Sequence, residues 1–355
     1  MRVACYEKNG SARDALKLID GCGDGRPFFL FVAPYAPHDP ATPADRHAGA
    51  FADVQPPRSP AWNENDVSDK PEWVQALPPI PPTEQALIDE GYRSRMRTLL
   101  AVDELVAGVD AALAETGAAE NTVVVIVSDN GFHFGEHRVA WGKVTPYDES
   151  TRVPLIVAGP GIAPGSTVDR LAINVDLAPT IAGLAGIETP AFVDGRSLIP
   201  VLHGEAPADW RDLVLLRQFE DVSERPARSR RAARAGERER ATANPSEGQP
   251  PAEMGGAAVS TGGESTPAAG ERRRFTQATL PPFAALRGED YLYVEYATGE
   301  REYYDLVTDP AALDNRAGEL PGERVQALSA RLAALANCAG AGCRSAEQPS
   351  ISEAS

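Results

Sequence analysis

Short apolar runs and one long periodic segment dominate the first half of the chain. Continuous apolar character over 27–34, 122–128 and 153–158 predicts three buried strands. Apolar side chains recur at three- and four-residue spacing over 83–116, which predicts a helix, and a shorter helix is expected over 176–184. This order of strand, helix, strand, strand and helix is typical of an α/β fold with a mainly parallel sheet.

The end of the chain carries the patterns of a small α+β subdomain. The segments 291–296 and 302–306 are rich in strand-forming residues around a Gly-containing turn, which predicts an antiparallel hairpin. Leucine and valine mark one face of 322–336, which predicts an amphipathic helix. We therefore expect a C-terminal subdomain over 280–345, followed by a tail over 346–355.

The segment 221–279 has few large apolar side chains. It holds ten arginines and eight acidic residues, and such a composition buries too little surface to offset the entropy lost on ordering the chain. We predict a disordered low-complexity insertion that separates 1–220 from 280–345. The arginines would also suit a polyanion, although the interspersed glutamates oppose that role.

Composition and charge narrow the class of protein. The 355 residues include 51 acidic and 34 basic side chains, which gives a net charge of −17 at pH 7. This charge repels a nucleic-acid backbone, so we expect no nucleic-acid partner. No apolar run reaches the ~18 residues of a membrane span, so we expect no integral membrane segment. The first 25 residues show no signal-peptide pattern, and the localisation stays open.

Lysine and cysteine add two points. Lysine occurs at four positions, against thirty arginines, so a lysine within a motif attracts attention. The four cysteines form no Cys-x-x-Cys pair, which argues against a structural zinc site. Cys338 and Cys343 are close enough in sequence for a small disulfide loop, and two reduced thiols are an equal alternative.

Four polar residues that follow the predicted strands carry candidate chemistry. His38 follows the first strand, Asp129 and Asn130 follow the second, and Lys143 comes fourteen residues after Asp129. In parallel sheets, ligands bind outside the carboxyl ends of the strands. Asp129 and Asn130 offer the hard oxygen ligands that Ca²⁺ or Mg²⁺ prefers. His38 is suited to bind an anionic oxygen or carry a proton, and Lys143 to stabilise negative charge in a transition state.

Each candidate also has an ordinary structural explanation. Asp-Asn-Gly is a common turn sequence, a histidine between prolines is a typical loop residue, and a single lysine is a typical surface charge. His133 and His137, in the intervening segment, either bind a metal or fix the loop through hydrogen bonds. From spacing alone, the chain is consistent with cation-assisted hydrolysis of an anionic ester.

Five segments together resemble the sulfatase family, in particular its glucosamine-6-sulfatase and arylsulfatase-like members. They are PFFLFVAPYAPHDP (27–40), VSDNGFHFGEHRVAWGKVTPYDESTRVPLIVAGPGI (127–162), NVDLAPTIAGLAGI (174–187), DGRSLIPVLHG (194–204) and YYDLVTDPAALDN (303–315). The resemblance implies an alkaline-phosphatase-like α/β fold with a smaller C-terminal subdomain. It also implies a sulfuric ester hydrolase that uses Ca²⁺ and acts on a sulfated small molecule or glycan.

The resemblance assigns a role to each candidate. Asp129 and Asn130 match a later pair of Ca²⁺ ligands in the family. His38 matches the histidine that contacts the sulfate or the leaving oxygen, and Lys143 matches the lysine that neutralises the sulfate. His137 matches a motif position to which the resemblance gives no role.

The family's nucleophile has no counterpart in the expected place. The resemblance implies a cysteine in a Cys-x-Pro/Ala-x-Arg motif, converted to formylglycine, and an early aspartate pair, all upstream of the strand at 27–34. Cys5 does not begin this motif, and Cys22 is followed two residues later by Asp24 in place of Pro or Ala. We therefore interpret 1–220 as the C-terminal part of a sulfatase catalytic domain, with a missing N-terminal half as an expected partner.

A sheet cut through its middle leaves an unpaired apolar strand edge and a metal site with too few ligands. We expect the chain alone to lack sulfatase activity and to bind Ca²⁺ poorly. Two alternatives stay open. One is a phosphate mono- or diester hydrolase of the same superfamily, and the other is a non-catalytic remnant that acts as a binding module.

Overall fold

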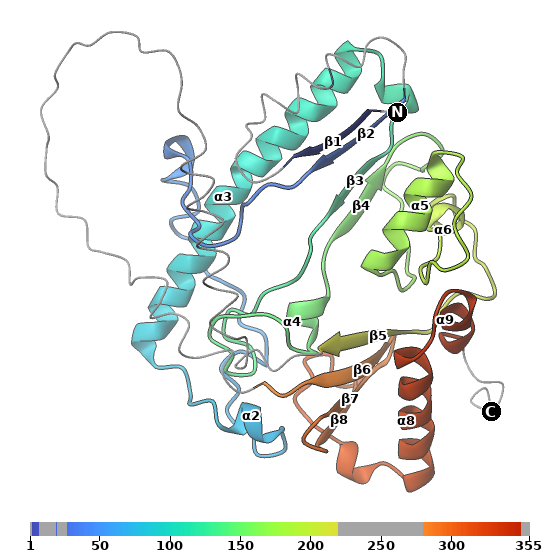
Figure 1. The fold of residues 1–355 in the computed structure, drawn as a ribbon. Helices are drawn as coiled ribbons and strands as arrows, with labels where there is room; N and C mark the ends of the chain where they lie inside the picture. Colours follow the sequence, from blue (N-terminus) through green and yellow to red (C-terminus); the bar gives the residue numbers. More distant parts are fainter. Residues whose placement is uncertain (1, 7–18, 20–26, 219–279, 349–355) are drawn as a thin grey trace, which may run out of the picture.

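The computed structural model describes residues 2–6, 19, 27–218 and 280–348, which form three sheets (Figure 1). The first is the parallel pair β1 (Arg2–Tyr6) and β2 (Phe28–Val32), and the second is the antiparallel pair β3 (Val124–Val127) and β4 (Leu155–Ala158). The third is a four-stranded antiparallel sheet in the order β5 (Leu213–Gln218), β6 (Phe283–Gly288), β7 (Tyr291–Tyr296) and β8 (Arg301–Asp305).

The two longest helices of the described residues are α3 (Pro82–Glu115) and α8 (Gly322–Ala336). The shorter α-helices are α2 (Glu72–Gln75), α4 (Asp148–Thr151), α5 (Leu177–Leu184), α6 (Ile199–Leu202) and α9 (Ala341–Ala346). Single 3₁₀ turns are η1 (Asp45–His47), η2 (Ala119–Asn121), η3 (Asn174–Asp176) and η6 (Ala317–Glu319).

The helix predicted over 83–116 is confirmed as α3. It begins at Pro82, where the fixed φ of proline suits the first helical turn. It ends where the Thr116 hydroxyl donates to the carbonyl of Ala112 at 2.8 Å, and Gly117 then turns the chain with a φ of 71°. The last turn buries Ala112 and Leu113 against apolar side chains of β2 and β3, which holds the two small sheets to the helix.

The strands of the N-terminal region are less buried than predicted. Phe31 of β2 is 55% exposed, Val127 of β3 is 41% exposed and Ile156 of β4 is 56% exposed. The prediction of fully buried strands is therefore wrong for this part of the chain. The reason is that each strand has a single neighbouring strand among the described residues, so part of its surface has nothing to pack against.

The pairing of β3 with β4 also differs from the expected parallel arrangement. Val124 lies opposite Ala158 and Val127 opposite Leu155, so the strands run antiparallel, whereas β1 and β2 run parallel. Parallel neighbours need a crossover connection, usually a helix. The connection over 128–154 has no helix longer than the single turn α4, and the chain returns along β3 in the opposite direction.

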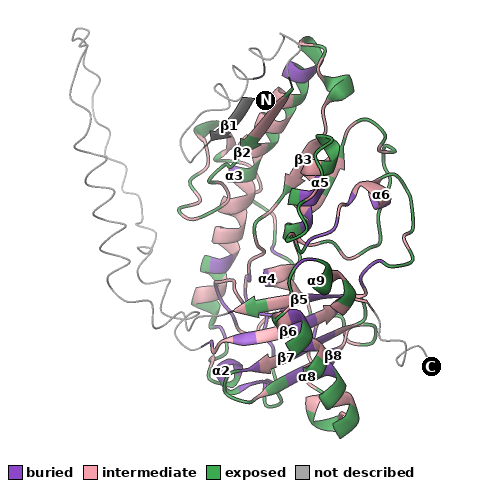
Figure 2. Ribbon diagram, turned by 45° about the vertical axis from the view of Figure 1, so that its right-hand side comes forward, coloured by how far each residue is buried: buried purple, intermediate pink, exposed green. Residues whose placement is uncertain are grey.

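The C-terminal sheet contains the predicted hairpin, which β7 and β8 confirm, and it packs on both faces. Leucines of α8 cover one face, and loops of the N-terminal region around Trp73 and Tyr147 cover the other. Buried residues accordingly gather in β6–β8, whereas half-buried and exposed residues predominate around β2 and α5 (Figure 2). The edge strand β5 pairs with β6 although it lies within 1–220, the range predicted to form the catalytic part.

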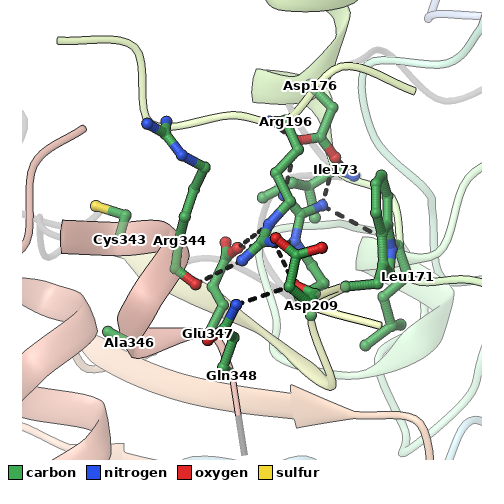
Figure 3. A network of polar contacts seen from close by, with 12 residues as sticks. Leu171, Ile173, Asp176, Arg196, Asp209, Cys343, Arg344, Ala346, Glu347 and Gln348 are labelled. Atoms are coloured by element: carbon green, nitrogen blue, oxygen red, sulfur yellow. Dashed lines mark hydrogen bonds and ion pairs between the residues drawn. The ribbon is translucent and has the colours of Figure 1, made fainter. Parts of the chain in front are cut away.

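A buried ion network joins α9 to the N-terminal region (Figure 3). Arg211, which is fully buried, donates through Nη2 to Asp176 Oδ1 at 2.7 Å and through Nε to Glu347 Oε2 at 3.0 Å. Arg196 donates to the same Glu347 oxygen at 2.9 Å. The two guanidinium groups thus balance the two carboxylates, which is the arrangement that buried charges require.

The remaining predictions concern the cysteines, the segment 221–279, the C-terminal tail and a membrane span. Cys338 and Cys343 form a disulfide, with a Cα–Cα distance of 4.9 Å, just before and within α9. The predicted insertion over 221–279, the Cys22 segment and residues 349–355 of the tail lie outside the described residues. In the part of the chain that is described, no helix is both long and apolar enough to cross a membrane.

Candidate active site

The structure brings two of the four candidate residues together. The Lys143 ammonium donates a hydrogen bond to Asn130 Oδ1 at 2.7 Å, and the Asn130 amide donates to the carbonyl of Gly131 at 2.9 Å. Both side chains are half-buried. A positive charge is therefore held at the end of β3, beside the segment that carries Asp129.

Close packing of α4 against the residues after Asn130 fixes this contact. Gly131 donates its amide to the carbonyl of Ser150 at 2.9 Å, and a Cβ at Gly131 would lie 2.1 Å from the carbonyl oxygen of Glu149. Glycine is thus required at 131 because the backbone of α4 occupies the space that a side chain would need. The Ser150 hydroxyl also accepts hydrogen bonds from the amides of Val144 and Thr145, at 2.7 and 3.2 Å.

His38 and Asp129 are exposed at the surface. The turn of His38 is closed by its own amide, which donates to the carbonyl of Tyr35 at 2.9 Å, and its Nδ1 lies 2.8 Å from the carbonyl of Asp39. Within the described residues, neither side chain hydrogen-bonds to Asn130 or Lys143. The structure therefore joins Asn130 with Lys143 and leaves the other two candidates facing solvent.

Arg95 of α3 connects the loop of His38 with the loop after Asn130. Its guanidinium lies 3.3 Å from Asp39 Oδ2 and stacks 3.9 Å above the ring of Phe132. An arginine suits this position because its planar group pairs with a carboxylate and stacks on a ring at the same time. Sequence reasoning missed Arg95, since a single arginine on a long helix carries no motif.

The two histidines of the intervening loop are buried and hydrogen-bonded. His133 Nε2 lies 2.7 Å from Thr145 Oγ1, and His137 Nδ1 lies 2.8 Å from Glu64 Oε2, with the His137 ring stacked on Tyr147. Burial lowers the pKa of both histidines to about 3, so both rings are neutral at pH 7. These contacts favour the loop-fixing explanation over a metal-binding one.

A buried lysine lies behind this loop. Lys70, whose side chain is inaccessible to solvent, lies 3.6 Å from Glu64 Oε1 and donates to Tyr304 Oη at 3.1 Å and to the carbonyl of Ala312. Burial raises the pKa of Glu64 to about 7, and the charge of Lys70 opposes this rise. Sequence reasoning missed Lys70 because it lies in no motif; the scarcity of lysine is the one signal that could have found it.

A carboxylate surrounded by tyrosines continues the network into the C-terminal sheet. Glu302 is fully buried and accepts hydrogen bonds from the hydroxyls of Tyr147, Tyr296 and Tyr304, at 2.7, 2.7 and 2.6 Å. Burial raises the pKa of Glu302, while the three hydroxyls stabilise its ionised form. Tyr147 follows Lys143 by four residues and hydrogen-bonds to Glu302 of β8, so this contact anchors the segment after Lys143 to the C-terminal sheet.

Glu149 is the second carboxyl near the site with a strongly shifted pKa. Burial raises its pKa to about 7, and its Oε2 lies 4.0 Å from His137 Nε2. A carboxyl that titrates near neutral pH is a candidate proton carrier when it lies in an active site. The ordinary alternative is a half-buried side chain of α4, whose backbone packs against Gly131.

The donors around Asn130 are of the right type for Ca²⁺ but too few. Asp129 supplies a carboxylate and Asn130 an amide oxygen, and that amide oxygen already accepts the hydrogen bond from Lys143. Ca²⁺ takes six to eight oxygen ligands. Among residues 27–218 and 280–348, no cluster of three or more His, Cys, Asp or Glu side chains is suited to a metal ion. The described residues alone do not make a Ca²⁺ site.

The Sulfatase family model matches residues 5–187, which include β2, the loop of His38 and the whole segment from Asp129 to Lys143. The chain belongs to the sulfatase family.

Two curated sulfatases illustrate the similarity. The arylsulfatase of Volvox carteri is 33% identical over 350 residues, which cover 90% of this chain and 49% of that protein. The human N-acetylglucosamine-6-sulfatase is 36% identical over 208 residues, which cover 58% of this chain and 37% of that protein. The chain thus spans less than half the length of these relatives.

Solved structures show the same fold. BT4656, solved in complex with its substrate D-glucosamine-2-N,6-O-disulfate, superposes with a TM-score of 0.64 at 22% identity, over 93% of this chain and 70% of that one. The phosphonate monoester hydrolase SpPMH of Silicibacter pomeroyi gives a TM-score of 0.60 at 23% identity, over 90% and 57%. The fold is therefore that of the alkaline-phosphatase-like sulfatases, as expected.

Proposed function

We propose that this chain contributes the sulfate-binding part of a sulfuric ester hydrolase that acts on a sulfated glycan or a related small molecule. The observation that carries the proposal is the contact between Lys143 and Asn130, in a chain of the sulfatase family. The substrate class is supported by the named substrate of BT4656 and by the N-acetylglucosamine-6-sulfatase relative.

Lys143 is the residue that would neutralise the sulfate. An ammonium group has three donors, so Lys143 can keep its hydrogen bond to Asn130 and still donate to a sulfate oxygen. The positive charge lowers the barrier because negative charge moves onto the ester oxygens as the bond to sulfur breaks. His38 is exposed and would donate a hydrogen bond or a proton to the leaving oxygen.

Asp129 and Asn130 are our proposed ligands for Ca²⁺, in a family that generally depends on calcium. Because two oxygen donors are too few, we expect further ligands from a completing polypeptide, which would also supply the formylglycine nucleophile. The chain alone is therefore expected to bind Ca²⁺ poorly and to show no turnover.

The test compares the chain alone with a completed enzyme. Aryl sulfate and glucosamine 6-sulfate hydrolysis would be followed with Ca²⁺, first for the chain alone and then after fusion to the formylglycine-containing half of a related sulfatase. We expect turnover only in the fusion, with losses of about 10²-fold or more in kcat for Lys143→Ala, by comparison with other oxyanion-stabilising groups. Arg170→Ala, at an exposed position, is the control for a lost positive charge and should leave kcat unchanged.

Two outcomes would contradict the proposal. A fusion that hydrolyses aryl phosphates or phosphonates faster than aryl sulfates would favour the phosphate-ester alternative, for which SpPMH is the structural precedent. A folded fusion without any hydrolase activity would favour the non-catalytic binding module.

A further inference from the structure

The backbone around Lys143 is held by one buried residue on both sides of the lysine. The His133 amide donates to the carbonyl of Gly142 at 2.8 Å, in an isolated antiparallel bridge. The His133 ring reaches past Lys143 to Thr145, where Nε2 and Oγ1 are 2.7 Å apart. We name this arrangement of His133, Gly142 and Thr145 the histidine clamp.

Lys143 needs such a support because it belongs to no helix or strand. Gly142 has a φ of 156°, and Val144 has a φ of 79°, in the left-handed region that a β-branched residue rarely adopts. Such a conformation persists only where surrounding contacts determine it. The clamp and the Ser150 hydroxyl, which accepts from the amides of Val144 and Thr145, supply those contacts.

The His133 ring does more than fill space in the core. The ring is fully buried, and its Nδ1 has no hydrogen-bond partner among the described residues, with the Glu136 carboxylate 3.9 Å away. A phenylalanine would fill similar space without burying an unpaired nitrogen. What the imidazole adds is its contact with the Thr145 hydroxyl, two residues after Lys143.

We propose that His133 is a positioning residue for Lys143: it fixes the backbone on both sides of the lysine and so holds the ammonium group on Asn130. The meaning of this role for catalysis rests on the proposed function, in which Lys143 neutralises the sulfate. The role itself concerns only the placement of Lys143 and can be measured without turnover.

Nuclear magnetic resonance of the lysine Cε groups tests the proposal in the full chain. With four lysines in the sequence, ¹³Cε-lysine labelling gives few signals, and Lys143→Arg and Lys70→Arg assign the two of interest. We expect two inequivalent Hε protons for Lys143 in the wild type, since its ammonium is held on Asn130. In His133→Phe and in Thr145→Val they should merge into one signal at the position of a free lysine.

Three controls decide between positioning and general loosening. Thr145→Ser keeps the hydroxyl and should retain the split Lys143 signal. The double variant His133→Phe/Thr145→Val should look like either single variant, because both remove the same contact. The Lys70 signal should not move in any of them, since Lys70 contacts Glu64 and Tyr304 rather than His133 or Thr145.

An unchanged Lys143 signal in both single variants would overturn the proposal. So would a Lys70 signal that shifts together with that of Lys143, because the effect would then be a general loosening of the loop. The outcome is independent of the hydrolase assay: an inactive fusion with a clamp-dependent Lys143 signal refutes the proposed function alone. An active fusion, together with a Lys143 signal that does not change in His133→Phe, refutes the histidine clamp alone.

Discussion

The strands β2, β3 and β4 of the N-terminal region are more apolar than the strands of the C-terminal sheet, yet they are less buried. In β7, Leu292, Tyr293 and Val294 are at most 1% exposed, because α8 covers one face of the sheet and loops cover the other. In β2 and β4, Phe31 and Ile156 are more than half exposed. Strand composition therefore does not explain the difference in burial.

The difference lies in the number of neighbours. The C-terminal sheet has four strands and a helix of its own, whereas β2 and β3 each have one free edge among the described strands. An apolar strand with a free edge is a template for pairing with another strand. We therefore expect the N-terminal region to gain stability from a completing polypeptide, and the C-terminal sheet to gain little.

The largest loss of stability is expected where the two regions are tied together. Asp176→Asn removes a charge that Arg211 needs, and breaking a buried ion pair in this way typically costs about 3–5 kcal/mol. Asp212→Asn is the control, because Asp212 pairs with Arg331 while 41% exposed, and such pairs contribute about 0–1 kcal/mol. Urea unfolding of both variants measures the contrast, and equal losses would show that the network is not a tie between the regions.

A matched pair of leucines compares the two regions directly. Leu286→Ala in β6, at a fully buried position, is expected to cost about 2–5 kcal/mol. Leu184→Ala in α5, where the side chain is 41% exposed, should stay within about 0.5 kcal/mol. The free energies of unfolding in urea test this expectation. A loss at Leu184 as large as that at Leu286 would mean that the N-terminal region already has a closed core.

The pH dependence of stability probes the contact between half-buried Glu149 of α4 and buried His137. Burial raises the pKa of Glu149 from 4.5 to about 7, so the folded state keeps a proton that the unfolded chain loses. The stabilising contribution is complete below pH 4.5 and is lost as the pH rises to about 7. Glu149→Gln should therefore gain stability over the wild type across this range, by up to about 3 kcal/mol at ~1.4 kcal/mol per pKa unit.

The neighbouring histidines act in the opposite direction and must be separated from this effect. Burial lowers the pKa of His133 and His137 from 6.5 to about 3, so their stabilising contribution is lost as the pH falls below 6.5. Comparing Glu149→Gln with the wild type at each pH cancels the histidine contribution. Glu205→Gln, at an exposed position, should show a constant difference, and a constant difference for Glu149→Gln would disprove the assigned burial effect.

The smallest change in folding stability is expected at the free surface of β4. Ile156→Thr removes an exposed apolar side chain and should alter the free energy of unfolding by about 0.5 kcal/mol or less. It should, however, reduce self-association in light scattering, since exposed apolar strands promote aggregation. A marked loss of stability instead would show that this face is already covered.

The elements with strong local patterns were predicted well. The helices over 83–116 and 322–336 and the hairpin at 291–306 lie within a residue or two of their predicted limits, since periodicity and turn residues are local signals. The antiparallel pairing of β3 and β4 and the addition of β5 to the C-terminal sheet were not predicted. Both depend on contacts between distant segments, which an apolar run does not encode.

The candidate site was predictable to a similar degree. Asn130 and Lys143 emerged from a motif and meet in space. The supporting groups Lys70 and Glu302 did not, because Lys70 meets Tyr304 across 234 positions of sequence and Glu302 meets Tyr147 across 155. Residues that share a loop can be predicted from a local motif, whereas the buried groups that pack against this loop come from distant parts of the chain.

The position of β5 has a consequence for the order of folding. β6 and β7 are joined by two residues, whereas β5 reaches β6 only after the chain has closed a loop over 219–282. The entropic cost of closing a loop grows by about 0.6 kcal/mol for each doubling of its length, and contacts distant in sequence form slowly. The hairpins β6–β7 and β7–β8 are thus expected to form first and β5 to dock last, so shortening 219–279 should speed folding far more than it raises stability.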